Sequence, residues 1–230
     1  MRSTVRPKPR EWREHLELHD ELGYLKNVLA CKYSCLSSGG YELVCKALEI
    51  NTIDMDYFSE DLESLTDILS TKLSKLSCAR PLVLNLVVTG IPVGTTLEAH
   101  AFTLFVGEHS CFFVDNNGEK YKDTYPYYRK IKTLLTEALG EYTKMEVFCN
   151  RKPTYNKKGI CSFASIETAA LFQDLIEDDV KQLLELNEKI LENNEPVFPT
   201  RDLIELPNVR DKLTKYTLEL EKSHKASISL

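Results

Sequence analysis

Three residues in the middle of the chain have the types and the order that thiol catalysis requires. His100 and Asp115 lie in or directly after two consecutive apolar segments, and Cys161 follows a polar loop that contains Gly159. Covalent acyl transfer needs a nucleophile, a base within hydrogen-bond reach of it, and a third group that orients the base. The sequence therefore predicts Cys161 as nucleophile, His100 as general base and then acid, and Asp115 as the orienting carboxylate.

Cys161 is predicted at the beginning of a helix, because apolar residues recur after it at helical spacing from Phe163 to Leu175. The first turn of a helix has unpaired amide groups and a positive partial charge, which lower the pKa of a thiol and bind a developing oxyanion. Each residue alone has a plainer explanation, since a buried Cys packs in a core, a strand His makes a hydrogen bond and an Asp before Asn-Asn-Gly begins a turn. The three in this order favour catalysis.

A pair of strands must bring His100 and Asp115 together. Residues 99–106 and 111–114 are rich in aromatic and β-branched side chains, and residues 107–109 between them are suited to a turn. If the two strands pair across this turn, His100 lies opposite the far end of the second strand, near Asp115. The imidazole then presents its other nitrogen to the cysteine.

Further strands and helices are predicted around this hairpin. The strands are 81–89, which precedes a loop with Pro92 and Gly94, and 145–149; the amphipathic helices are 57–76, 127–139 ending at Gly140, and 163–191 in two pieces. Residues 21–50 are helical in parts and interrupted by Ser37-Ser38-Gly39-Gly40. This order predicts an α+β fold in which helices flank a central mixed β-sheet on both sides.

The length of the chain, 230 residues with 43% hydrophobic content, favours one sizeable core over two full domains. We predict three parts along the sequence. They are a flexible basic arm at 1–20, a catalytic domain at 21–195 and a helical C-terminal extension at 196–230.

The overall charge of −6 and the 28% share of charged residues argue against a nucleic-acid-binding surface and against a disordered chain. The basic opening lacks the apolar core of a signal peptide, and no stretch approaches membrane-spanning length. The sequence therefore predicts a soluble, cytoplasmic protein, or one that leaves a bacterial cell through a dedicated secretion machine.

The seven cysteines are an odd number in an acidic chain, which favours free thiols in a reducing compartment. Cys31, Cys35 and Cys45 suggest a zinc site, but no second pair of ligands follows at matching spacing. Cys31 and Cys35 also suit successive turns of one helix. We therefore predict structural cysteines and no metal site.

The order His, Asp, Cys resembles the clan of cysteine proteases that contains adenain and the Ulp1-type SUMO proteases, as well as the YopJ-like effectors. The segment after Cys161 is most similar to the YopJ family. Its motifs are 163–172 (FASIETAALF), 183–191, 194–199 (NEPVFP) and Leu206-Pro207. The resemblance covers about residues 80 to 210. The chain departs from the family where Asp115 replaces Glu, Ser162 replaces a glycine, and no glutamine lies just before Cys161.

The resemblance implies an Ulp1/adenain-like fold and a secreted bacterial effector that acts in the host cytoplasm. YopJ-like enzymes transfer acetyl from acetyl-CoA through the cysteine to Ser, Thr or Lys of host signalling proteins, with inositol hexakisphosphate as activator. A polyanion site needs a basic cluster, and the candidates are Arg201, Arg210, Lys212, Lys215, Lys222 and Lys225. With Glu219 and Glu221 among them, the same residues also suit a solvated helix face. The Ulp1-like relatives instead imply hydrolysis of ubiquitin-like isopeptide bonds.

The missing glutamine leaves the oxyanion donor open. The nearest side-chain amides are Asn150 and Asn156, and Asn156 equally suits a turn. Two further hypotheses remain. Cys31 or Cys35 serves His100 in a papain-type or transglutaminase-type arrangement, or the chain is an inactive binding module with partner-facing helices at 56–76 and 178–222.

Overall fold

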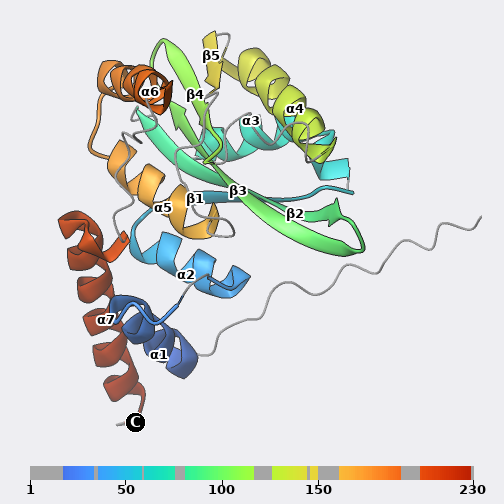
Figure 1. Ribbon diagram of the computed structural model, residues 1–230. Helices are drawn as coiled ribbons and strands as arrows, with labels where there is room; N and C mark the ends of the chain where they lie inside the picture. The colour runs from blue at the N-terminus through green and yellow to red at the C-terminus, as the bar shows by residue number, and fades with distance from the viewer. Residues whose placement is uncertain are drawn as a thin grey trace, which may run out of the picture.

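The computed structural model describes residues 18–33, 36–58, 60–75, 81–116, 126–143, 146–149, 161–192 and 203–228. Within these residues, seven α-helices surround a mixed five-stranded β-sheet (Figure 1). The α+β class and the central mixed sheet predicted from the sequence are thereby confirmed.

The strands are β1 (Asn51–Asp56), β2 (Leu82–Val93), β3 (Thr96–Val106), β4 (Ser110–Val114) and β5 (Glu146–Cys149). The helices are α1 (Leu18–Leu29), α2 (Ser38–Ala47), α3 (Leu65–Lys75), α4 (Pro126–Thr143), α5 (Cys161–Phe172), α6 (Glu177–Glu192) and α7 (Pro207–Ile228), with short 3-10 helices η1 (Glu60–Leu62) and η3 (Leu203–Glu205).

The strands lie in chain order across the sheet, from β1 to β5. The central strands β2, β3 and β4 pair antiparallel through two hairpins, whereas the outer strands β1 and β5 each pair parallel to their neighbour. A parallel neighbour needs a crossover connection, which α3 supplies after β1 and α4 supplies before β5. The long strand β3 thus lies in the middle of the sheet.

Side chains on successive residues of β3 point to opposite faces of the sheet and enter two separate apolar clusters. Ala101 and Phe105 belong to the cluster under α1, α2, α5, α6 and α7, whereas Phe102 and Leu104 belong to the cluster under α3 and α4. Helices therefore cover both faces (Figure 1).

Helix α7 packs on the first of these clusters and lies beside α1 (Figure 1). Its residues Val209 and Leu213 are buried, and Lys26 of α1 forms an ion pair with Glu221 of α7 at 2.5 Å. The two ends of the described chain therefore meet on one side of the molecule. In the described part of the chain, every helix is too short or too polar to cross a membrane.

Three predicted boundaries were wrong for local reasons. Pro92 lies inside β2 instead of a loop, and it is tolerated there because the pairing of β2 with β1 already ends at Thr89. Helix α4 passes Gly140 and ends at Thr143. Segment 37–40 begins α2 instead of breaking a helix, since the Ser37 side chain accepts a hydrogen bond from the Gly40 amide and caps the helix.

Two further elements differ from the prediction. The helix predicted at 57–76 is divided into η1 and α3, and β1 was not predicted. Only Ile53 and Met55 of β1 are buried apolar residues, so the strand gives a weak alternating signal. Its pairing with β2 is a long-range feature.

Candidate active site

The end of β4 places Asp115 beside His100. The pairing of β3 with β4 ends at Thr103 opposite Val114, so β3 continues past the point where β4 stops. Asp115 is the next residue after β4, and its Oδ1 atom lies 2.9 Å from Nε2 of His100. The hairpin predicted from the sequence thus brings these two side chains together.

Both members of this pair are buried, with residue exposures of 7% for His100 and 1% for Asp115. The ring of Phe102 meets the imidazole edge-on, with 4.7 Å between the ring centroids. This contact and the carboxylate hold the ring in one orientation. Because Nε2 faces Asp115, Nδ1 is the nitrogen left for a nucleophile.

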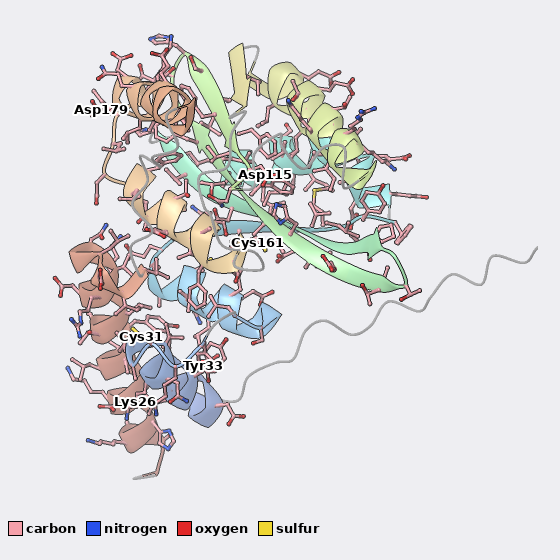
Figure 2. The ribbon with its side chains drawn as sticks, in the orientation of Figure 1. Lys26, Cys31, Tyr33, Asp115, Cys161 and Asp179 are labelled. Atoms are coloured by element: carbon pink, nitrogen blue, oxygen red, sulfur yellow. The ribbon has the colours of Figure 1, made fainter. Side chains whose placement is uncertain are left out.

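Cys161 is the first residue of α5 and is partly exposed, and its thiol interacts with the His100 side chain. The backbone amide of Ala101 also donates a hydrogen bond to the sulfur. Ala101 lies on the stretch of β3 beyond the end of β4, where the ladder with β4 no longer uses its amide. Figure 2 shows Cys161 at the end of α5 beside the sheet.

Burial and mutual charge set the proton affinities of His100 and Cys161. Burial lowers the pKa of His100, but the Asp115 carboxylate and the Cys161 sulfur overcome this effect and raise that pKa to about 10. Burial raises the pKa of the Cys161 thiol, but the hydrogen bond and charge of His100, with the Ala101 amide, lower it below its ordinary value. The pair therefore favours a thiolate beside an imidazolium.

This arrangement can carry out nucleophilic chemistry. A thiolate is the reactive form of cysteine, and the neighbouring imidazolium can protonate a leaving group. The unpaired amides of the first turn of α5 lie at the same place and can bind a developing negative charge. The structure thus brings together His100, Asp115 and Cys161.

A hydrogen bond between the residues after β4 and helix α5 was not predicted from the sequence. The Thr168 hydroxyl lies 3.0 Å from the Oδ1 atom of Asn116, and both residues are buried. Asn116 follows Asp115 directly, so this contact fixes the chain next to the orienting carboxylate to the helix that carries Cys161. The sequence predicts Asn116 as part of a turn, and a turn residue gives no signal of such a distant partner.

The cysteines of the alternative hypotheses lie elsewhere. Cys31 is exposed in the turn after α1, well separated from Cys161 in Figure 2, and Cys45 is buried in α2. No group of three or more potential metal-ligating side chains occurs among the described residues. Cys35 and the amide candidates Asn150 and Asn156 lie outside the described residues.

Lys212, a member of the predicted basic cluster, makes contacts across the fold. The Nζ atom of Lys212 lies 3.1 Å from Oε1 of Gln173 and 3.5 Å from the carbonyl oxygen of Leu48. Lys212 therefore joins α7 to the residues that directly follow α2 and α5. Arg201 lies outside the described residues.

Comparisons with known proteins give a partial structural similarity. No protein-family model matches the chain, and neither does any curated protein sequence. One solved structure with similarity is that of the Legionella pneumophila effector protein RavZ, residues 1–487, at 15% sequence identity and a TM-score of 0.30. The match covers 53% of this chain and 38% of the RavZ chain. The chain thus spans well under half of the RavZ chain.

Proposed function

We propose that the protein is a cysteine-dependent acyltransferase that moves acetyl from acetyl-CoA to Ser, Thr or Lys side chains of other proteins. The observation that carries the proposal is the contact of Cys161 with a His100 ring that Asp115 orients at 2.9 Å. The YopJ-like motif at 163–172 supports the acetyl donor and the protein acceptor. It also supports an Ulp1/adenain-like fold and a secreted effector that acts in a host cell.

In the first half of the reaction, the Cys161 thiolate attacks the carbonyl carbon of the acetyl thioester. The first-turn amides of α5 stabilise the oxyanion of the tetrahedral intermediate. The intermediate collapses with cleavage of the bond to the sulfur of coenzyme A. His100 gives its proton to that sulfur, so coenzyme A leaves as a thiol and Cys161 carries the acetyl group.

In the second half, the neutral imidazole of His100 removes the proton of the incoming hydroxyl or amine. The acceptor oxygen or nitrogen attacks the thioester carbonyl, and the bond to Cys161 breaks. The acetyl group is then on the acceptor, the sulfur leaves as a thiolate, and His100 holds the proton beside it. Asp115 keeps the ring oriented in both halves.

The acyl-enzyme is the decisive species to measure. Incubation of the protein with acetyl-CoA should give an acetyl adduct on the Cys161 peptide that hydroxylamine removes, as expected of a thioester. The reaction should be run with and without inositol hexakisphosphate, which the resemblance suggests as activator. Cys161→Ala is the control and should stay unmodified at this peptide. An unmodified wild-type protein in both conditions would argue against acetyl transfer.

The alternative is an isopeptidase for ubiquitin-like proteins, in which water replaces the protein side chain as acceptor. Its support is that Cys161 is partly exposed and that nearby Glu98 and Ala99 of β3 are exposed too, so a polypeptide carbonyl can reach the thiol. Ubiquitin and SUMO probes with a reactive C-terminal propargyl group should then label Cys161. Labelling without an acetyl adduct would select the isopeptidase.

A further inference from the structure

A chain of buried polar side chains lies under the first two turns of α5. Tyr41 of α2, Asn85 of β2, Thr103 of β3 and Ser165 of α5 are each at most 5% exposed. The Tyr41 hydroxyl oxygen lies 3.1 Å from Oγ of Ser165, and Oγ1 of Thr103 lies 3.0 Å from both the Ser165 carbonyl oxygen and the side-chain amide of Asn85. Three elements of the core thus reach the helix that begins with Cys161.

The direction of the first branch follows from the number of protons available. Ser165 has one hydroxyl proton, and it donates that proton to the Ser162 carbonyl oxygen at 3.1 Å. Ser165 can therefore only accept from Tyr41, so the bond runs from the Tyr41 hydroxyl to Ser165 Oγ. The branch ends on the carbonyl of the residue next to Cys161.

The second branch joins β2 and β3 to the same helix. The Thr103 hydroxyl donates toward two oxygens, the side-chain oxygen of Asn85 and the backbone carbonyl of Ser165, each at 3.0 Å. The branch therefore joins Asn85 to the Ser165 carbonyl through Thr103.

We propose that this network, through the side chains of Tyr41 and Thr103, sets the axial position and rotation of the first turns of α5 and so holds the Cys161 sulfur against His100. The inference rests on the proposed function, because the network matters only if this contact matters. Apolar contacts of α5 alone permit small shifts along the sheet, whereas buried hydrogen bonds fix donor and acceptor to a few tenths of an ångström. Tyr41 and Thr103 are positioning residues, since their hydrogen bonds in this network go to Ser165 and not to the sulfur.

The readout is the rate at which iodoacetamide alkylates Cys161 in the folded protein, measured as a function of pH. After each reaction the protein is digested, and mass spectrometry quantifies the alkylated Cys161 peptide. Tyr41→Phe removes one hydroxyl, and Thr103→Val replaces one residue by another of similar shape. The matched control is Thr217→Val, because the buried Thr217 hydroxyl donates to the Leu213 carbonyl within α7, away from this network. The groups that act on the thiol, His100 and Asp115, are unchanged in all three variants.

We expect Cys161 to be alkylated about three- to tenfold more slowly in Tyr41→Phe and in Thr103→Val than in wild type at about pH 6. The rates should be equal at high pH, where the thiol is ionised in every variant. Thr217→Val should follow the wild-type profile. Superimposable profiles for wild type and a folded Tyr41→Phe would overturn the proposal, even if Thr103→Val does not fold. An equal change in Thr217→Val would also overturn it, by showing a general effect of lost stability.

One more variant separates this inference from the proposed function. His100→Ala should move the alkylation profile toward that of an ordinary thiol, because the imidazolium that stabilises the thiolate is gone. If His100→Ala leaves the profile unchanged, the contact between His100 and Cys161 is wrong and the proposed function fails with it. If His100→Ala changes the profile and Tyr41→Phe does not, only the positioning network is wrong.

Discussion

His100 and Cys161 change their proton affinities in opposite directions on folding. The pKa of His100 rises from 6.5 to about 10, and the pKa of Cys161 falls from 9.0. Because folding raises the pKa of His100, this residue contributes stability that is complete below pH 6.5 and lost as the pH rises through about 10. Because folding lowers the pKa of Cys161, this residue contributes stability that is complete above pH 9.0 and lost as the pH falls through the pKa of the folded state. The two residues therefore change the free energy of unfolding in opposite directions as the pH rises.

In wild type, the opposite pKa shifts of the two groups should partly offset each other in the slope of stability between about pH 7.5 and about pH 8.5. The folded pair holds one proton on His100, and the unfolded pair holds one on Cys161. In Cys161→Ala, the unfolded state no longer has the thiol proton. The folded state still holds a proton on His100, because Asp115 raises the pKa of that residue. The free energy of unfolding of Cys161→Ala should thus fall by up to about 1.4 kcal/mol per pH unit relative to wild type. Chemical denaturation across this range measures it.

The control for this measurement is Cys45→Ala. Cys45 is a buried thiol whose pKa is raised to about 12, chiefly by burial, so it is protonated in both states below pH 9.0. Its removal should lower stability by the same amount throughout the range. Parallel curves for wild type and Cys161→Ala would show that no proton moves between the two side chains.

Asp115→Asn should weaken the nucleophile without removing any atom of the contact. The amide can donate to Nε2 of His100, which leaves the ring neutral with its proton on Nδ1, facing the sulfur. The thiol then loses its imidazolium partner, which raises the pKa of Cys161. Removal of the Asp115 charge lowers that pKa, but by less, because Asp115 acts on the thiol more weakly than His100 does. We expect acyl-transfer activity to fall by about 100-fold or more and the alkylation profile to shift to higher pH.

Asp179→Asn is the matched control for this substitution, because it makes the same change at an exposed residue of α6. Figure 2 shows Asp179 far from Cys161. Its alkylation profile should be that of wild type. A wild-type profile for Asp115→Asn would mean that the carboxylate does not control the thiol.

At the scale of the elements, a bulge in β2 lies next to the strand position that pairs with His100. Val88 pairs with His100, and the register then shifts before Ile91. Gly90 lies within the bulge with φ +71°, where a side chain is strained. A Cβ atom there would also lie 2.9 Å from Oδ1 of Asp56, which accepts a hydrogen bond from the Phe58 amide. The bulge therefore depends on glycine for two reasons.

Gly90→Ala should lower the free energy of unfolding by about 2 kcal/mol or more, since backbone strain costs about 1 to 2 kcal/mol and the Asp56 contact adds to it. Gly94→Ala isolates the strain, because Gly94 has φ +59° with open space around the added Cβ. We expect about 1 kcal/mol for this control. Equal losses in the two variants would show that Asp56 moves aside at no cost.

At the scale of the whole molecule, α7 belongs to the apolar cluster that supports α5. Leu213 is 0% exposed and packs in that cluster, whereas Leu218 on the same helix is 50% exposed. Leu213→Ala should destabilise the protein by about 2 to 5 kcal/mol through the lost contacts and the cavity. Leu218→Ala should change stability by less than about 0.5 kcal/mol. Similar small losses in both would indicate that α7 is a separable appendage.

The sequence by itself identified the elements and residues whose signals are local. The hairpin of β3 and β4 follows from two runs of aromatic and β-branched residues around a turn, and the helix after Cys161 follows from the helical spacing of its apolar residues. Pairing of the two strands across their short turn predicted His100 near Asp115, because a hairpin has few possible registers. Side-chain type then indicated thiol chemistry at Cys161.

Only the tertiary structure determined which distant segments meet at this site. The Tyr41 to Ser165 hydrogen bond joins residues 124 positions apart, and the strand β1 is recognisable mainly by its pairing with β2. A hydroxyl in a helix or a strand carries no mark of its partner, since both partners are satisfied by water until the chain folds. Burial removes that water, and the need to pair every buried polar group then selects the partners that surround the helix of Cys161.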